Sequence, residues 1–320
     1  MVTIISAALK QRRIELGISQ QDLAEKMGYK SRSSIAKIES GEVDLPLSKL
    51  LQLADILEIS PDKLFAGTTS VTPGQREPTG ASQRLDGSRT IAIVLAGGKS
   101  TRNRQNTPNQ FVNVLGKPVI VYCLETLQQH PLIDEICVAC LKGWEDVLSA
   151  YAKQYGITKL TTITTGSKSG IQSLKKCLDR INARCMPTDT IFIHEATRPL
   201  LAAETISKVI QTCKAKGSAS SYHPMKEYVQ FLKEDDTLTR LDRNAVITLQ
   251  SPEAYTYQFI EEAFSLANNR GLALGDSWFG IMAFELGLDI GLVEDASNSL
   301  KIVRKEDIAT FAAIASSHSA

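Results

Sequence analysis

The sequence predicts two domains of different class, a small all-α domain followed by a larger α/β domain with a mainly parallel sheet. Apolar residues recur at helical spacing over residues 1–66, whereas short β-rich segments alternate with helical ones over residues 89–320. Residues 67–88 between them are polar and interrupted by prolines and glycines, so we expect a flexible linker. A chain of 320 residues with 43% apolar content is long enough for two hydrophobic cores.

The composition favours a protein of the cell interior. No apolar run approaches the ~18 to 20 residues that span a bilayer, and residues 1–10 lack the apolar core and cleavage site of a signal peptide. We therefore expect a cytoplasmic protein with no membrane contact.

The cysteines are expected to be reduced and mostly buried. All six occur in the C-terminal part of a chain too large and apolar to depend on disulfides. Cys137 and Cys140 have C-x-x-C spacing, but alternation along a predicted strand at residues 136–141 points them to opposite faces. This favours buried packing over a metal or redox site.

Strand and helix patterns alternate along the larger domain. The β-rich segments are residues 90–95, 133–141 and 190–194, and the helical ones are residues 119–129, 172–181 and 203–216. This alternation is typical of βαβ units, which build parallel sheets.

Capping signals divide the N-terminal domain into short helices. The first is predicted at residues 7–16 and ends at Gly17. Ser19, with Asp22 three residues later, is an N-cap for a second helix at residues 20–27.

A third helix is predicted to begin near Ser31, after a tight turn at residues 28–30. Ile35 and Ile38 have the spacing that docks this helix on Leu23. Two more helices, at residues 46–57 and after the Ser-Pro pair at 60–61, would complete a five-helix bundle.

Four motifs in register resemble the phage-repressor, Xre-type helix-turn-helix family. They are LKQRR at 9–13, SQQDLA at 19–24, IAKIESG at 35–41 and the leucine-rich segment 50–57. The resemblance covers about residues 6–66 and implies double-stranded DNA as a partner. In that family the third helix enters the major groove, so the candidate DNA contacts by position are Ser31, Arg32, Ser33, Ser34 and Lys37.

These candidates suit different parts of the duplex. Arg32 fits a guanine edge, whereas the serines and Lys37 fit phosphates or smaller base contacts. Residues 1–66 carry nine Lys/Arg and nine Asp/Glu, so they lack the excess of basic residues that is usual in DNA-binding domains. Basic residues nevertheless gather at 10–13 and 30–37. A protein-binding role for the bundle therefore stays open beside DNA binding.

A buried strand at residues 90–95 runs directly into a glycine-rich turn, Ala96-Gly97-Gly98-Lys99-Ser100-Thr101-Arg102. Such a turn leaves backbone N–H groups facing outward, which is a geometry that binds phosphate oxygens.

Further motifs follow this turn in one order: PNQF at 108–111, LGKP at 115–118, HEATRP at 194–199, LDR at 241–243, QSP at 250–252 and LKI at 300–302. Together they resemble the 2-C-methyl-D-erythritol 4-phosphate and ribitol-phosphate cytidylyltransferase family over roughly residues 89–315. The resemblance implies a nucleotidyltransferase-like, Rossmann-like sheet with a β-arm. It also implies CTP or a related nucleotide and a sugar-alcohol phosphate as ligands, with Mg²⁺ as cofactor and no metal site built from protein alone.

The resemblance assigns roles by matching position. Arg102 and Lys301 match the catalytic cations that hold the triphosphate while a substrate phosphate attacks the α-phosphate of CTP. The implied nucleotide-binding residues are Ala96, Gly97, Gly98, Ser100, Asn109 and Ser173. The implied acceptor-binding residues are Glu195, Arg198, Arg243 and Ser251, with Arg243 arriving from a partner subunit. His194 is expected to be a core histidine.

Several charge-handling positions depart from the family pattern. Asn109 stands where the family has a lysine that contacts the α-phosphate, Ser100 where it has glycine, Gly170 where it has arginine and Glu195 where it has aspartate. The loss of one preorganised electrostatic contact typically costs ~10²–10³ in rate. The departures therefore leave catalysis in question.

Three hypotheses follow: a regulator that senses a nucleotide or sugar phosphate, a working cytidylyltransferase that also binds DNA, and a scaffold whose α/β domain only dimerises the regulator. A homodimer is expected in each case, because helix-turn-helix domains bind paired half-sites and the resembled α/β domain exchanges a β-arm. The arm is predicted at residues 228–232 and 238–241, with a turn at 234–236.

Overall fold

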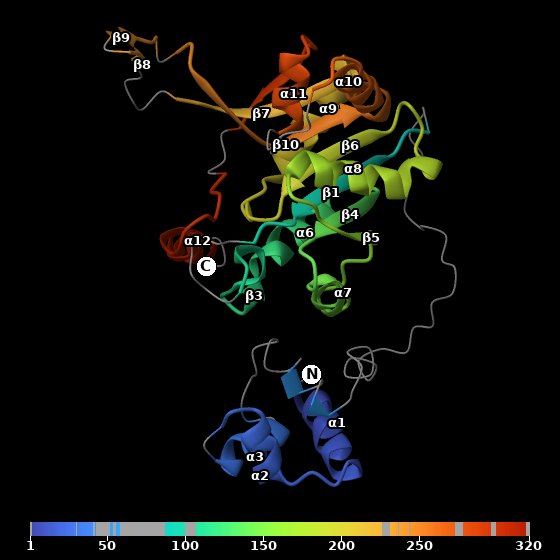
Figure 1. Ribbon diagram of the computed structural model, residues 1–320, viewed down its shortest axis with the longest axis vertical. Coiled ribbons are helices and arrows are strands. Elements are labelled where there is room, and N and C mark those ends of the chain that lie inside the picture. The colour runs from blue at the N-terminus through green and yellow to red at the C-terminus, as the bar shows by residue number, and fades with distance from the viewer. Residues whose placement is uncertain are drawn as a thin grey trace. The chain divides into compact units, whose positions relative to one another are not determined.

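The computed structural model divides the chain into two compact units, Met1–Thr79 and Gly80–Ala320, and each is described by itself (Figure 1). The structure describes residues 2–29, 31–40, 42, 52–53, 56–57, 87–99, 107–225, 231–235, 237–242, 244–272, 278–295 and 299–317. None of the helices in this part of the chain is long and apolar enough to cross a bilayer.

The helices described in the N-terminal unit are α1 (Val2–Glu15), α2 (Gln20–Lys26) and α3 (Arg32–Glu39). The predicted N-cap of α2 is confirmed, since the Ser19 side chain accepts a hydrogen bond from Asp22 N and the Asp22 carboxylate accepts one from Ser19 N. The predicted start of the first helix at residue 7 is wrong, because α1 begins at Val2. The β-branched residues there have low helix propensity, but extending a helix that has already nucleated costs little.

One apolar core holds the N-terminal unit together. Leu23, Ile35 and Ile38 are buried in it, which confirms the predicted docking of α3 on α2. Leu53 and Leu57 are buried in the same core. Apart from residues 52–53 and 56–57, the predicted fourth and fifth helices lie outside the described residues.

A buried ion pair fixes α3 against α1. Arg13 Nε lies 2.6 Å from Glu39 Oε1, and Arg13 Nη2 donates to Glu39 Oε2 at 3.1 Å. Gln20, the first residue of α2, donates to the same carboxylate at 2.9 Å. The three helices therefore share one carboxylate, which limits how far α3 can rotate within the unit.

A seven-stranded sheet forms the centre of the second unit, in the order β11-β7-β10-β6-β1-β4-β5. Its strands are β1 (Thr90–Ala96), β4 (Glu135–Cys140), β5 (Leu160–Thr165), β6 (Thr190–Glu195), β7 (Ser218–Pro224), β10 (Ile247–Thr256) and β11 (Leu292–Glu294). All neighbours are parallel except β10, which is antiparallel to β6 and β7. The predicted mainly parallel sheet is confirmed.

Helices cover the sheet (Figure 1). They are α6 (Val119–Gln129), α7 (Glu145–Gln154), α8 (Gly170–Ile181), α9 (Ala203–Lys216), α10 (Tyr257–Asn269), α11 (Phe279–Glu285) and α12 (Lys305–Ser317). Short elements connect them: the 3₁₀ turns η1 (Asn109–Phe111) and η2 (Asn182–Arg184) and the strands β2 (Asn113–Val114) and β3 (Lys117–Pro118). The apolar sides of α8, α10 and α11 share one core with β1, β4 and β6.

The cysteines pack as predicted. Five of the six are buried, Cys185 is half-buried, and all six are free thiols. Cys137 belongs to the core beneath α8. Among the described residues no group of three or more His, Cys, Asp and Glu side chains forms a metal site.

A separate hairpin connects β7 to β10. Its strands are β8 (Phe231–Glu234) and β9 (Thr237–Arg240), which pair antiparallel. The hairpin projects from the body of the second unit (Figure 1). Its described residues lie within the segment where the sequence predicted the β-arm, with Asp235 in a turn after β8.

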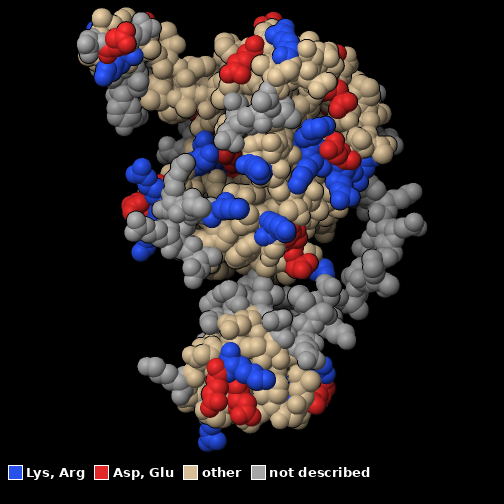
Figure 2. Space-filling view, in the orientation of Figure 1, with Lys and Arg blue, Asp and Glu red and all other residues tan. Residues whose placement is uncertain are grey.

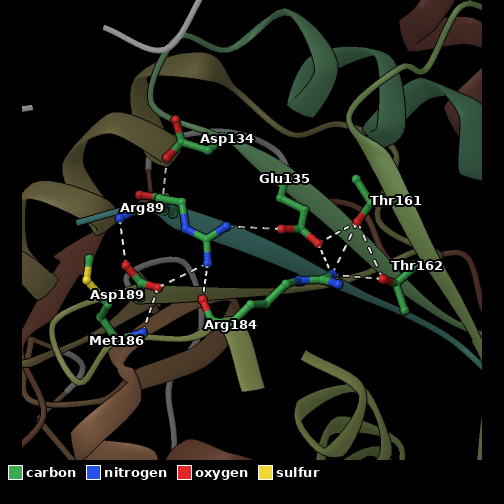
Figure 3. Close-up of polar contacts among 9 residues, drawn as sticks. Arg89, Asp134, Glu135, Thr161, Thr162, Arg184, Met186 and Asp189 are labelled. Carbon is green, nitrogen blue, oxygen red and sulfur yellow. Dashed lines mark hydrogen bonds and ion pairs between the residues drawn. The ribbon is translucent and has the colours of Figure 1, made fainter. Parts of the chain in front are cut away.

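A polar cluster closes the amino ends of the parallel strands (Figure 3). Arg89, just before β1, lies 3.7 Å from Glu135 on β4 and 3.5 Å from Asp189 before β6. Arg184 pairs with the same Glu135 and donates to Thr162 on β5 at 3.0 Å. These contacts tie β1, β4, β5 and β6 together near their amino ends. The carboxyl ends of the strands, where parallel sheets bind ligands, are left for a binding site.

Candidate nucleotide pocket and DNA-facing helix

A pocket of about 360 Å³ opens at the carboxyl end of β1. Its walls are the last residues of β1 and the turn after it, η1, the loop before α8, the end of β6, and the segment 301–303. The residues that line it are Leu95, Ala96, Gly97, Gly98, Asn109, Gln110, Ser167, Lys168, Ser169, Gly170, Ser173, Glu195, Thr197, Lys301, Ile302 and Val303. The sequence predicted seven of these as site residues: Ala96, Gly97, Gly98, Asn109, Ser173, Glu195 and Lys301.

The turn after β1 is held in shape by Gln110. Its amide nitrogen donates to Ala96 O at 2.8 Å and to Gly98 O at 2.9 Å. Because both partners are carbonyl oxygens, they fix which end of the amide is the nitrogen. The described part of the predicted turn, Ala96 to Gly98, is therefore anchored by a buried side chain.

Two glycines let this turn touch the loop before α8. A Cβ added to Gly166 would lie 3.1 Å from both Cys140 O and Gly97 Cα, and one added to Gly97 would lie 3.5 Å from Gly166 Cα. The contact is backbone to backbone, so a side chain at position 166 would force the two loops apart.

The loop before α8 is tied down by serines. Ser169 caps the helix by accepting from Gln172 N, and the Ser173 hydroxyl donates to Ser169 O at 2.8 Å while it accepts from Ser167 N at 2.9 Å. Ser173 lines the pocket but is buried. Its hydroxyl hydrogen is therefore used to shape the loop.

Glu195 is the centre of charge on the opposite wall. Its two carboxylate oxygens accept from Arg198 Nε at 2.9 Å and from Lys301 Nζ at 2.7 Å. Arg198 also donates to Ser299 O at 2.7 Å, and the Lys301 ammonium lies 5.5 Å from the centre of the Trp278 ring. The resemblance assigned Glu195 and Arg198 to the acceptor and Lys301 to the triphosphate, and the structure brings all three into one ion-pair network.

His194 and Ser251 lie beneath this network. Ser251 Oγ is 3.2 Å from His194 Nδ1, and both side chains are buried, as predicted for His194. Burial lowers the pKa of His194 to about 4, so the ring is neutral near pH 7. Ser251, predicted to bind the acceptor, is fully buried, and its hydroxyl accepts a hydrogen bond from the backbone Glu195 N at 3.4 Å.

Asn109 has a structural role that the sequence did not reveal. Its side chain is 3% exposed, and its amide nitrogen donates to Ile302 O at 3.1 Å and to Val303 O at 3.2 Å. These bonds hold the segment that carries Lys301. Asn109 therefore brings no positive charge to the pocket, and its amide nitrogen already donates to two backbone carbonyl oxygens.

Three predicted site residues, Ser100, Arg102 and Arg243, lie outside the described residues. The other nine lining residues, Lys168 among them, were not predicted as site residues, and neither was Trp278 beside Lys301. Lys168 could have been noticed from the Ser-Lys-Ser-Gly pattern just before a helix start, whereas no local signal places Trp278 beside Lys301.

The expected Mg²⁺ can be tested against these side chains. Glu195 is the only carboxylate among the lining residues in the described part of the chain, and both its oxygens are ion-paired. Mg²⁺ usually keeps several waters and binds through one or two carboxylates plus substrate phosphates. A magnesium ion there would therefore be carried mainly by the triphosphate, with Glu195 as its carboxylate contact among the described residues, and it would neutralise phosphate charge.

The predicted DNA-facing residues lie at the start of α3 and along it. Ser31 is the N-cap, accepting from Ser33 N at 3.2 Å, and Ser34 is half-buried. Arg32, Ser33 and Lys37 are exposed. Ser33 and Lys37 are one helical turn apart on the same face, whereas Arg32 points to a different face.

Sequence profiles match both parts of the chain. Residues 90–317 match the profile of the 2-C-methyl-D-erythritol 4-phosphate cytidylyltransferase family. The chain belongs to this family. Residues 9–64 match a helix-turn-helix profile, so a helix-turn-helix domain is fused to the cytidylyltransferase domain, as the sequence predicted.

Relatives of the cytidylyltransferase domain are named for two acceptors. The ribitol-5-phosphate cytidylyltransferase of Lacticaseibacillus paracasei is 32% identical over 225 residues, which cover 69% of this chain and 96% of the relative. That of Vibrio parahaemolyticus is 29% identical and covers 70% of this chain and 94% of its own length. The 2-C-methyl-D-erythritol 4-phosphate cytidylyltransferase of Syntrophus aciditrophicus is 28% identical over 69% of this chain and 93% of its own length.

Solved structures of cytidylyltransferases share the fold. The 4-diphosphocytidyl-2C-methyl-D-erythritol synthase of Anaerococcus prevotii superposes with a TM-score of 0.61 at 19% identity, over 72% of this chain and 98% of the other. The 2-C-methyl-D-erythritol 4-phosphate cytidylyltransferase of Francisella tularensis superposes with a TM-score of 0.56 at 20% identity, over 70% of this chain and 100% of the other. The predicted nucleotidyltransferase-like fold is confirmed.

Proposed function

We propose that the protein is a DNA-binding transcription regulator whose cytidylyltransferase domain binds CTP or a related nucleotide together with a sugar-alcohol phosphate. Binding of these ligands changes its affinity for DNA. CTP and ribitol 5-phosphate are the first ligands to test, because the relative from Lacticaseibacillus paracasei is named for ribitol 5-phosphate.

The observation that carries this proposal is a contrast within the pocket, between groups suited to binding phosphates and the uncharged Asn109. Gln110 anchors the described part of the turn after β1, and Lys301 lines the pocket. Backbone N–H groups and an ammonium group of this kind support phosphate binding. Asn109, in contrast, brings no charge, and its amide is bonded to Ile302 and Val303. A site can keep ground-state binding while it loses contacts that act only in the transition state.

A second candidate is a working cytidylyltransferase with an appended DNA-binding domain. It is favoured by Arg198 and Lys301, both held beside the pocket by Glu195. In that reaction a phosphate oxygen of the polyol phosphate forms a bond to the α-phosphorus of CTP. The bond from that phosphorus to the β-phosphate oxygen breaks, and pyrophosphate leaves with its electron pair.

Two assays on the full-length protein separate these functions. A thermal shift with CTP and Mg²⁺ and little pyrophosphate release supports the regulator, whereas rapid release with ribitol 5-phosphate or 2-C-methyl-D-erythritol 4-phosphate establishes the enzyme. No shift with nucleotide or polyol phosphate would leave the α/β domain as a dimerisation scaffold.

We also propose that the protein is a homodimer joined through the β8–β9 hairpin. Three apolar side chains of this hairpin are exposed: Phe231 at 53%, Leu232 at 47% and Leu238 at 66%. Exposed apolar side chains on a projecting hairpin favour burial against a second copy.

A further inference from the structure

Trp278 contacts the lysine of the pocket from α11, an element that contributes no described residue to the lining. The Lys301 ammonium lies 5.5 Å from the centre of the Trp278 ring, within the range of a cation–π contact. Trp278 is the N-cap residue of α11, and Glu195, which pairs with the same ammonium at 2.7 Å, belongs to β6. The ammonium is therefore held by partners on two separate elements.

The two cations beside Glu195 are held in different ways. Arg198 also donates to Ser299 O at 2.7 Å and to Ser299 Oγ at 3.2 Å, so several acceptors fix its guanidinium. In the described part of the chain, Lys301 Nζ donates to Glu195 alone, and the Lys301 side chain is 38% exposed. A single ion pair at a partly exposed site restricts a flexible lysine stem only weakly. The Trp278 ring supplies a second restraint.

The start of α11 is packed closely enough to keep this ring in place. Phe279, the next residue, is 3% exposed, and its ring meets the Tyr255 ring edge-on, with 4.7 Å between centroids. Gly280 N donates to the buried Glu253 carboxylate at 3.3 Å. A Cβ added to Gly280 would lie 2.8 Å from Tyr255 Oη, so only glycine allows α11 to approach β10 this closely. The backbone position of Trp278 is thus set by the core.

An aromatic face can hold a cation without cancelling its charge. The quadrupole of the indole ring attracts the ammonium, but the ring brings no net charge of its own. A second carboxylate in this place would also hold the lysine, yet it would compete with a phosphate for the same ammonium. An aromatic ring is therefore suited to positioning a lysine that has to meet an anionic ligand.

We propose that Trp278 is a positioning residue, whose ring keeps the Lys301 ammonium at the wall of the pocket, where a phosphate of the nucleotide meets it. The proposal rests on the proposed function, in which the pocket binds a nucleotide. Trp278 acts through Lys301 and takes no part in bond making.

The test is a double-mutant cycle on the full-length protein, with binding of CTP and Mg²⁺ measured by calorimetry. The variants are Trp278→Leu, Lys301→Met and the two combined. A cation–π contact at a partly exposed site contributes about two- to fivefold in affinity, so Trp278→Leu should weaken CTP by that factor. The same substitution in the Lys301→Met background should leave CTP affinity unchanged, because the ring then has no ammonium to position.

Two further variants separate the contact from packing. Trp278→Phe keeps a ring and disturbs packing least, so in the same cycle it should show a smaller loss with the same dependence on Lys301. Phe284→Leu removes a ring that is 73% exposed on the same helix, and it should leave CTP affinity unchanged.

The contact can also be followed without nucleotide. The chain has two tryptophans, so Trp144→Phe leaves Trp278 as the only one. Lys301→Met in that variant should shift the emission maximum of Trp278, because it removes a charge from beside the ring. An unchanged emission maximum would show that the ammonium and the ring do not meet in solution, which overturns the proposal.

The outcomes of the cycle distinguish this proposal from the one beneath it. Equal losses from Trp278→Leu with and without Lys301 would show a structural role only. That result, or an unchanged CTP affinity in Trp278→Leu, overturns the role of Trp278 while nucleotide binding by the wild type stands. No CTP binding by the wild type overturns both proposals.

Discussion

Glu253 is a buried carboxyl on β10, and its protonation affects the free energy of unfolding. Its side chain is 3% exposed and accepts hydrogen bonds from Tyr255 at 2.8 Å and from Gly280 N at 3.3 Å. Burial raises the pKa of Glu253 to about 7 from an ordinary 4.5. Because the pKa is raised in the folded state, the native protein binds more protons than the unfolded chain between these values, and stability falls as pH rises through that window.

We predict that Glu253→Gln is more stable than the wild type at pH 8, by on the order of 3 kcal/mol, and about equal at pH 4.5. Glutamine can accept the same hydrogen bonds without a charge. Urea unfolding at both pH values measures this. A variant destabilised equally at both would show that Glu253 is needed for packing, contrary to the account.

The pH dependence of stability that His194 contributes is opposite to that of Glu253, so the wild type and Glu253→Gln must be compared at the same pH. The pKa of His194 is lowered by burial to about 4 from an ordinary 6.5, so its neutral form is favoured and stability falls as pH falls through that window. The effect is common to the wild type and Glu253→Gln, and it cancels in their difference.

A second prediction for a single residue concerns the missing charge at Asn109. Asn109→Lys should raise pyrophosphate release from CTP and polyol phosphate by about 10²-fold with little change in CTP affinity, because a new cation would act mainly in the transition state. Asn109→Ala removes the bonds to Ile302 and Val303 without adding charge, so it serves as the control and should only lower Tm. A rate gain in both variants, or in neither, would contradict the prediction.

At the scale of elements, the β8–β9 hairpin should join two subunits. Leu238 is 66% exposed, and a charge there opposes burial in an interface. Leu238→Asp is therefore expected to halve the mass measured by light scattering at micromolar concentration while Tm of the α/β unit is kept. A wild type that is already monomeric would refute the predicted dimer.

Helix α3 should carry DNA recognition. Arg32→Ala is expected to cost ~1–3 kcal/mol and to relax sequence preference, whereas Lys37→Ala should weaken all sequences alike and flatten the salt dependence. Their different faces on the helix support these different roles. Selected-site binding measures both effects, with Lys176→Ala as a charge-matched control in the other unit, and unchanged affinity in both variants would show that another face meets DNA.

Local patterns predicted the elements better than the contacts between them. The helices expected at 119–129 and 203–216 have those limits as α6 and α9, because apolar spacing and flanking residues define their ends. The helix expected at 172–181 begins earlier, at Gly170, because Ser169 caps it. Glycine there does not favour a helix, so propensity concealed the first turn.

The pocket was harder to predict because its contacts join distant segments. Asn109 bonds to Ile302, 193 positions later, and Glu195 pairs with Lys301, 106 positions later. The resemblance assigned Asn109 and Lys301 to the nucleotide and Glu195 to the acceptor, but it could not show that Asn109 supports a loop or that Ser251 is buried. Such roles depend on packing that no local pattern carries.

At the scale of the whole molecule, regulation of DNA binding by a ligand of the pocket requires coupling between the two units. DNA is expected to bind α3 in Met1–Thr79, whereas the pocket belongs to Gly80–Ala320. If nucleotide changes the affinity for DNA by some factor, DNA must change the affinity for nucleotide by the same factor. This reciprocity holds whatever path the coupling takes.

The most direct test of the account is therefore calorimetric titration of CTP with Mg²⁺ into full-length protein, alone and saturated with a DNA site obtained by selection. Pyrophosphate release is followed in the same samples. We predict saturable CTP binding with slow turnover. We also predict that DNA changes the affinity for CTP by the same factor by which CTP changes the affinity for DNA. Identical CTP affinity with and without DNA, or rapid turnover in either sample, would contradict it.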